Sequence, residues 1–219
     1  AQESRGLGDV YKRQGQNVQK FDLQLYLRSR FIDKGYKVSQ IGTKKISGLF
    51  GLHPLPDFLF NTQYSDVDKV YAFNRVMKDV SMQEKPDVIL LGIPDSLLPL
   101  NNKHRFSFGL YAYEIFNAVQ PDFVITSLMA NDGYNDEFYS EISKMAKYKY
   151  NVNIDAYFVS QFCPLSNSIW SEKLSYVYLP RMELPKTEYK VYTTSDLNND
   201  ILFKQAEKKL LLYGKYEQY

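Results

Sequence analysis

The stretch Pro86-Asp87-Val88-Ile89-Leu90-Leu91-Gly92-Ile93-Pro94 decides the fold class. Four consecutive large apolar residues lie between turn-forming residues, which is typical of a strand buried on both faces, as in a parallel sheet. The same order recurs at Pro121-Asp122, which precedes the apolar run Phe123-Val124-Ile125-Thr126. The repetition predicts two buried parallel strands.

Segments with helical spacing alternate with these strands. We expect helices over residues 21–34, 65–84, 110–119 and 136–148, and further strands over residues 37–41 and 154–159. Ser65 is suited to cap its helix, with Asp68 three residues on. Helices between short apolar strands imply βαβ crossovers. The predicted fold class is therefore α/β: a doubly wound, mostly parallel sheet with helices on both faces, similar to phosphate-loop NTPases, with its first strand truncated.

The predicted domain organisation has three parts. Residues 1–14 include Asp9-Val10-Tyr11-Lys12-Arg13-Gln14, which matches a translated transposon-end adapter from sequencing libraries, so we expect native sequence to begin near Gly15. Residues 15–180 form a nucleotide-binding-like α/β domain, with a last strand at 176–179. Residues 181–219 form an extension in which a helix over 196–212, ended by Gly214, packs on that domain or on a partner.

Composition narrows the classes of function. Lys and Arg total 27 against 25 Asp and Glu, a net charge of +2, which argues against a nucleic-acid or anionic-membrane surface over the whole protein. No apolar run reaches the roughly 20 residues that cross a bilayer. One cysteine, Cys163, excludes an internal disulfide, and no Cys/His spacing suggests zinc. These features predict a cytoplasmic protein.

The first candidate site is the segment before the first helix, Gly15-Gln16-Asn17-Val18-Gln19-Lys20-Phe21-Asp22. Lys20 stands where a phosphate loop places the lysine that contacts the β- and γ-phosphates of ATP or GTP with Mg²⁺. Gln19 replaces the preceding glycine, and a left-handed conformation there costs about 1–2 kcal/mol. Phe21 replaces the hydroxyl residue, and Asp22 is a substitute metal ligand. A degenerate loop and an ordinary helix N-terminus remain alternatives.

The second candidate site follows the strand at residues 88–93. Asp95 is placed to hold a Mg²⁺-bound water, and Asn101 and Asn102 add donors for a carboxylate or phosphate. A solvated strand-to-loop turn explains the same residues. His53 and His104 have no carboxylate partner identifiable from spacing, and Cys163 is flanked by residues that favour packing over reactivity.

The segments Phe21-Asp22-Leu23-Gln24-Leu25-Tyr26-Leu27-Arg28 and Gly35-Tyr36-Lys37-Val38-Ser39-Gln40-Ile41-Gly42 carry a resemblance that extends over nearly all of residues 15–219. Other matching residues are Leu49-Phe50-Gly51, His53, Pro56, Pro86-Asp87-Val88-Ile89, Gly92-Ile93-Pro94, Pro99, Asn101-Asn102, Phe108-Gly109, Ala112-Tyr113-Glu114, Ala118-Val119, Pro121-Asp122, Tyr213-Gly214 and Glu217. Together they resemble a family of accessory proteins of clostridial-type peptide-maturation systems.

The resemblance implies a role in making a modified, bacteriocin-like peptide. Its expected partners are a radical-SAM maturase and a small ribosomally made precursor peptide, and the family is similar to phosphate-loop proteins in this half. Family members often have Gly-Gly after Ile-Pro, whereas this chain has Asp95-Ser96, which removes glycines that backbone-mediated anion binding would use.

Three hypotheses follow. The first is a non-catalytic or weakly nucleotide-binding accessory protein, and the second an active nucleotide-dependent enzyme that uses Lys20 on phosphates and Asp95 near Mg²⁺. The third is a structural subunit whose C-terminal helix docks on a partner.

Overall fold

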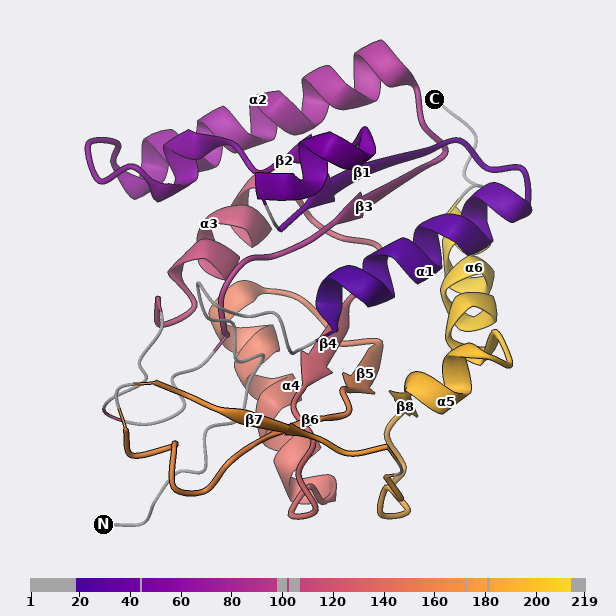
Figure 1. Cartoon of the computed structure of the whole chain (residues 1–219). Helices are drawn as coiled ribbons and strands as arrows, with labels where there is room; N and C mark the ends of the chain where they lie inside the picture. Colours follow the sequence, from indigo (N-terminus) through magenta and orange to yellow (C-terminus); the bar gives the residue numbers. More distant parts are fainter. Residues whose placement is uncertain are drawn as a thin grey trace. The chain divides into compact units, whose positions relative to one another are not determined.

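The computed structural model describes residues 19–43, 45–97, 102, 107–171, 173–180 and 182–213 (Figure 1). These residues form an α/β structure in which most strand pairs are parallel. They divide into two compact units. We call residues 20–94 and 110–120 the α1 unit, and Gln19 with residues 95–109 and 121–219 the α4 unit, and describe each by itself.

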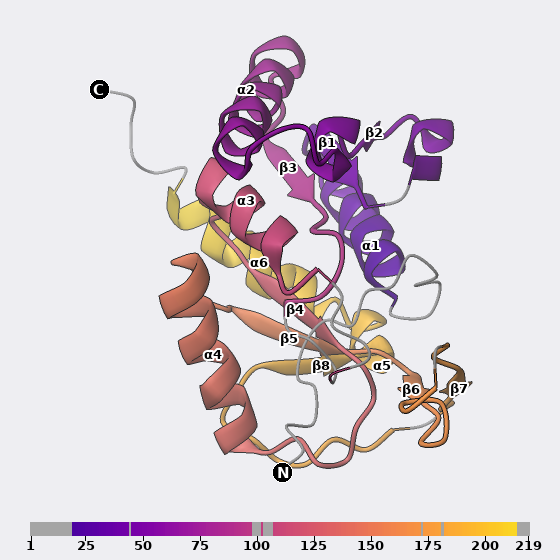
Figure 2. The same ribbon diagram turned by 90° about the vertical axis from the view of Figure 1, so that its left-hand side faces the viewer.

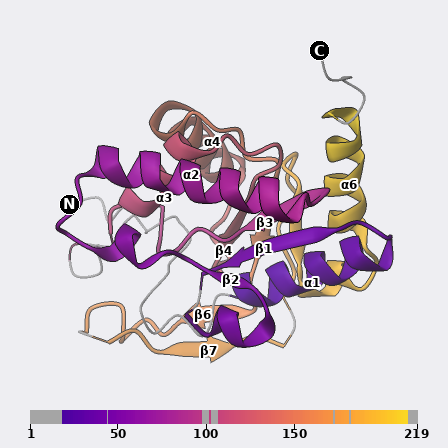
Figure 3. The same cartoon turned by 90° about the horizontal axis from the view of Figure 1, so that it is seen from above.

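The α1 unit is a three-stranded parallel sheet with helices on both faces. Its elements are α1 (Lys20–Asp33), β1 (Val38–Gly42), the 3₁₀ helix η1 (Lys45–Phe50), β2 (His53–Pro54), the 3₁₀ helix η2 (Asp57–Phe60), α2 (Asp66–Glu84), β3 (Val88–Leu91) and α3 (Leu110–Ala118). Helix α1 covers one face of the sheet, and α2 and α3 cover the other (Figures 1 and 3). Ile41 of β1 is buried on the second face with Phe73 and Met77 of α2 and Ile115 of α3.

The strand order β2-β1-β3 creates a topological switch point. From the central strand β1 the chain continues to β2 on one side, and α2 then carries it across to β3 on the other side. Ser39 pairs with Ile89 and Ile41 with Leu91, so the carboxyl ends of β1 and β3 reach the same edge. In α/β sheets a switch point of this kind is the usual place for a ligand.

Local sequence signals set the bounds of α2. The amide of Asp68 donates to the Ser65 hydroxyl at 3.2 Å, which confirms Ser65 as the N-cap. The Ser65 hydroxyl also donates to the Asp68 carboxylate at 2.6 Å. The helix ends at Glu84, and the C-cap residue Lys85 adopts a left-handed conformation with φ of 47° and donates its amide to the Ser81 carbonyl.

The α4 unit holds a second parallel sheet, of order β4-β5-β8 (Figure 2). Its elements are β4 (Ile125–Leu128), α4 (Asp136–Tyr150), β5 (Ala156–Val159), β6 (Phe162–Pro164), β7 (Tyr176–Tyr178), β8 (Val191–Thr193), α5 (Thr194–Leu197) and α6 (Ile201–Tyr213). Strands β6 and β7 form an antiparallel pair. Side chains of α4 pack on the sheet through an aromatic core that includes Phe138, Tyr139 and Tyr157.

The observed strand pairing differs from the expectation of one sheet. The described strands form two three-stranded parallel sheets and a hairpin, because no hydrogen-bonded ladder in the described ranges joins β3 to β4. The strand expected at 176–179 is β7, which pairs with β6 in the hairpin. Strand β8, in a segment where we expected no regular element, completes the second sheet, so residues beyond 180 contribute to it. No helix in the described part of the chain is long and apolar enough to cross a bilayer.

Candidate functional site at the carboxyl ends of strands β1 and β3

Lys20, the first residue of α1, reaches the carboxyl end of β3. Its side chain is buried, with 9% of the residue exposed, and the ammonium group donates to the Ile93 carbonyl at 3.3 Å. Ile93 lies two residues beyond the last residue of β3. The helix N-terminus and the lysine therefore place positive charge at the switch point of the α1 unit.

Gln24 lies one helical turn after Lys20, on the same side of α1. Its amide nitrogen donates to the Ile41 carbonyl at 3.4 Å. A Cβ atom at Gly92 would lie 2.6 Å from Gln24 Nε2 and 2.6 Å from Thr43 Cγ2. The side chains of Gln24 and Thr43 therefore meet directly over Gly92, and a larger residue at position 92 would displace them.

Ser47 lies over Gly42, the last residue of β1. It is fully buried in η1, and its hydroxyl would lie 2.1 Å from a Cβ atom at Gly42. Phe21 of α1 lies 3.5 Å from the same point. Gln40, 1% exposed, shares this face of β1 because alternate strand residues face the same side.

These residues contain five buried polar atoms that have no hydrogen-bond partner among the described residues. The atoms are Gln24 Oε1, both side-chain polar atoms of Gln40, Thr43 Oγ1 and Ser47 Oγ. We call these four residues the polar cluster. An unpaired buried polar atom costs about 1–3 kcal/mol, and five together equal much of a typical domain's stability. A bound molecule that supplied the missing hydrogen bonds would remove this cost.

Gln19, beside Lys20 in sequence, belongs to the α4 unit. Its φ of 48° is the left-handed conformation for which a phosphate loop uses glycine. Its side-chain oxygen accepts hydrogen bonds from the Gln161 amide at 2.9 Å and the Thr194 hydroxyl at 3.4 Å. Gln161 and Thr194 follow the carboxyl ends of β5 and β8, so the side chain of Gln19 contacts that edge of the second sheet.

The remaining predicted site residues have different surroundings. Asp95 adopts a left-handed φ of 64°, and one of its carboxylate oxygens accepts a hydrogen bond from the Ser107 amide at 2.7 Å. Asp22, in the first turn of α1, and Asn102 are exposed. Asn101 lies outside the described residues. The structure places Lys20 and Asp22 in the α1 unit, and Gln19, Asp95 and Asn102 in the α4 unit.

His53 has a carboxylate partner that sequence spacing does not reveal. Its Nε2 atom lies 2.5 Å from an oxygen of Glu84, whose other oxygen accepts a hydrogen bond from the Ser39 hydroxyl. This arrangement joins β2, the end of α2 and β1. Because the serine and the histidine both contact the glutamate rather than each other, a nucleophile–base pair is not formed here.

Cys163 is half-buried in β6. Burial raises the pKa of its thiol, and the negative charge of Asp132 adds to the effect. The thiol therefore stays protonated near neutral pH, which agrees with packing rather than nucleophilic reactivity.

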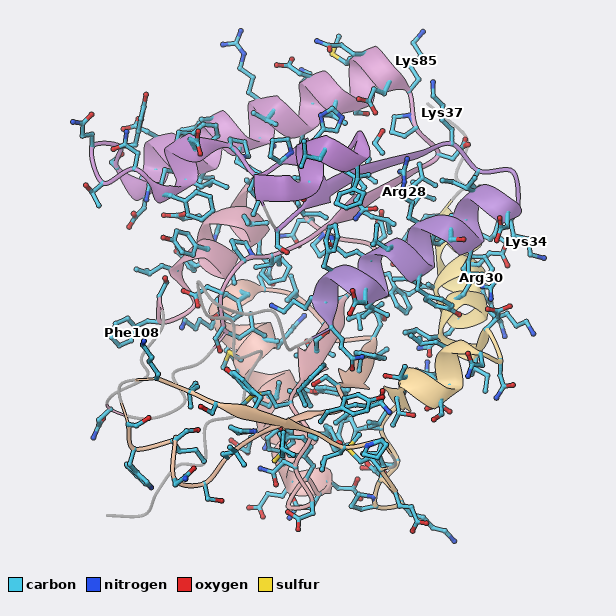
Figure 4. All side chains as sticks on the ribbon, in the orientation of Figure 1. Arg28, Arg30, Lys34, Lys37, Lys85 and Phe108 are labelled. Carbon is cyan, nitrogen blue, oxygen red and sulfur yellow. The ribbon has the colours of Figure 1, made fainter. Side chains whose placement is uncertain are left out.

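Basic residues lie at the C-terminal ends of helices α1 and α2. Figure 4 shows Lys34 and Arg30 at the end of α1, and Lys85 at the end of α2. Cations are favourable at helix C-termini because of the helix dipole. Arg28 donates to the Val38 carbonyl at 2.8 Å and ties α1 to the start of β1. Arg30, Lys34 and Lys85 are therefore explained by their positions at helix C-termini, without a binding site.

Comparison with known proteins adds no identification: no protein-family model matches the sequence, and no curated protein matches it. Within the described ranges, no three His, Cys, Asp or Glu residues are grouped so that they could hold a metal ion.

The polar cluster was missed in the sequence. Gln40 stands between Ser39 and Ile41 in a predicted strand, and Thr43 and Ser47 follow that strand's end. A buried strand that contains an amide and leads into a hydroxyl-bearing loop was the available signal. This sequence signal becomes informative only when the strand order β2-β1-β3 is known, because that order puts the switch point at the end of β1.

Proposed function

We propose that this chain is an accessory protein that binds a phosphate-bearing ligand, such as ATP or GTP, in the maturation of a ribosomally made peptide. The observation that carries the proposal is the buried ammonium group of Lys20 at the carboxyl end of β3, where α1 begins. A lysine and a helix N-terminus both favour an anion, and their effects add because they act at the same edge.

The surroundings of Lys20 support binding more than catalysis. Phe21 occupies the position of the hydroxyl that would hold Mg²⁺, and its ring is packed near Gly42. The strained backbone of Gln19 takes the place of a flexible glycine. A phosphate group can be held by such a degenerate loop, whereas positioning a metal for phosphoryl transfer requires the missing ligand.

Titration calorimetry with ATP and GTP, each with Mg²⁺, tests the binding proposal. We expect binding in the micromolar range, reduced at least about tenfold in Lys20→Ala. Lys34→Ala is the matched control, since Lys34 is an exposed lysine just after the end of the same helix (Figure 4). Equal affinities of Lys20→Ala and Lys34→Ala, or no binding to the unmodified protein, would contradict the proposal.

The alternative is an ATP- or GTP-dependent enzyme of the same pathway. It is favoured by the position of Asp95, four residues beyond the end of β3, where a carboxylate can hold a Mg²⁺-bound water. Release of inorganic phosphate separates the two functions. Turnover that is lost in Asp95→Asn would establish the enzyme, whereas tight binding without turnover supports the accessory protein.

The pathway rests on the resemblance to peptide-maturation accessory proteins. We expect a radical-SAM gene and a short precursor gene beside this one, and co-purification of their products with this protein. Flanking DNA that carries neither gene would contradict the pathway while leaving the phosphate-binding proposal intact.

A further inference from the structure

The polar cluster lies beside Lys20 and is not explained by phosphate binding. Lys20 and Gln24 are one turn apart on the same side of α1, and Gln24 meets Thr43 over Gly92. None of the four cluster residues, Gln24, Gln40, Thr43 and Ser47, is charged. The cluster is therefore a group of uncharged, buried amides and hydroxyls next to a positively charged side chain.

The chemistry of the unpaired atoms limits what can satisfy them. Gln24 Oε1 and Gln40 Oε1 only accept hydrogen bonds, whereas Gln40 Nε2 only donates. A second phosphate or a carboxylate, which only accepts, would leave both amide oxygens unpaired. An ammonium group, which only donates, would leave Gln40 Nε2 unpaired. A partner must both donate and accept, as an alcohol hydroxyl does.

The arrangement of these atoms narrows the partner further. They come from three elements, namely helix α1, strand β1 and the segment between β1 and β2. A flat ring presents its donors and acceptors in one plane, whereas hydroxyl groups on neighbouring sugar carbons point in different directions. A sugar suits the cluster better than the edge of a nucleobase.

We propose that the polar cluster binds the hydroxyl groups of a sugar whose phosphate is held at Lys20, so that the ligand is a sugar phosphate or a ribonucleotide. This inference rests on the proposed phosphate site and specifies its ligand. In the structure the five atoms are buried, so the proposal requires the side chains of Gln24 and Thr43 over Gly92 to move apart when the ligand binds.

Calorimetry of the full chain with three probes tests the inference: ATP, 2′,3′-dideoxy-ATP and inorganic tripolyphosphate. Dideoxy-ATP lacks two hydroxyls, so we expect it to bind about tenfold more weakly than ATP. Tripolyphosphate has no sugar, and we expect it to bind more weakly still. Equal binding of the three probes would overturn the sugar site and leave the phosphate site standing. Failure of all three to bind would overturn the phosphate site, and the sugar site with it.

Gln40→Met provides a second measurement. The substitution removes two unpaired polar atoms and keeps the volume, so we expect the ligand-free protein to melt at a higher temperature. It should also lose the preference for ATP over dideoxy-ATP while binding tripolyphosphate unchanged. Gln83→Met, on an exposed position of α2, is the control and should change neither property.

A water-filled cluster predicts the opposite result for Gln40→Met. If ordered waters alone satisfied Gln40, the substitution would lower the melting temperature and leave the preference among nucleotides unchanged. Either a lower melting temperature or an unchanged preference would overturn the proposal.

Discussion

Phe108 is the least expected of the non-glycine residues that have a left-handed backbone. Its φ is 52°, a conformation that brings Cβ close to the following carbonyl and costs about 1–2 kcal/mol. The ring is half-exposed (Figure 4), and the Lys149 ammonium group donates to the carbonyl of this residue at 2.8 Å, a bond that does not involve the ring. We expect Phe108→Gly to raise the free energy of unfolding by up to about 1 kcal/mol in urea denaturation, after the cost of glycine flexibility.

Phe108→Ala is the control for this prediction. It removes the ring and retains Cβ, so the strain persists and no stabilisation is expected. If Phe108→Ala stabilises the protein as much as Phe108→Gly, the exposed ring rather than the backbone is the source of the effect.

Glu84 at the end of α2 contacts β1 and β2, and its contribution to the stability of the α1 unit depends on pH. The hydrogen bond from the Ser39 hydroxyl holds the pKa of Glu84 below its ordinary value of 4.5, with His53 adding to the effect against the opposing influence of burial. Because the pKa is lower in the folded state, this stabilisation is complete above about pH 4.5 and is lost as the pH falls through the folded value. Urea denaturation between about pH 6 and pH 3 should show a smaller loss for Glu84→Gln than for the unmodified protein. Parallel pH profiles would contradict this role.

Helices α2 and α3 share a buried ion pair. Lys69 Nζ lies 3.1 Å from Glu114 Oε1, and the two residues are 8% and 2% exposed. Burial raises the pKa of Glu114, against the opposing effect of Lys69, so this carboxylate depends strongly on its partner. Lys69→Met should lower the free energy of unfolding by about 3–5 kcal/mol, because it leaves a buried charge unpaired.

The double variant Lys69→Met with Glu114→Met separates charge from packing. It should recover most of the stability, since an apolar pair of similar volume needs no hydrogen-bond partners. The loss in Lys69→Met alone should also shrink at low pH, where Glu114 is protonated. Thermal denaturation of the three proteins checks both points, and a double variant as unstable as Lys69→Met would contradict them.

The helices and apolar strands followed from local sequence, whereas strand partners did not. Residues 21–34, 65–84, 110–119 and 136–148 are close to α1, α2, α3 and α4, because apolar spacing and caps act within each helix. Strand pairing depends on contacts between distant segments, which is why one sheet was expected where hydrogen bonding forms two. Strand β8 has three residues and little apolar character in its surroundings, so its pairing with β5 gave no local signal.

The same distinction applies to the candidate site. Lys20 could be named as a candidate from the sequence because a lysine at the start of a helix has a local pattern. In the structure Gln19, just before it, has the left-handed backbone for which that pattern uses glycine. Gln40 and Ser47 could not be found in this way. They stand out because they bury side-chain polar atoms without partners among the described residues, which depends on α1 covering one face of β1.

At the scale of the whole molecule, the chain passes between the two units four times, at residues 19/20, 94/95, 109/110 and 120/121. Each unit has its own apolar core, but unfolding the α1 unit would free both ends of segment 95–109, which belongs to the α4 unit. We therefore expect the two units to unfold together.

Phe73→Ala, in the core of the α1 unit, should lower the free energy of unfolding by about 3–5 kcal/mol. Trp170, the single tryptophan, lies in the α4 unit, so its fluorescence serves to follow the unfolding of that unit. Its unfolding midpoint in urea should fall in Phe73→Ala together with the midpoint from circular dichroism. An unchanged Trp170 midpoint would show that the α4 unit unfolds independently of the α1 unit.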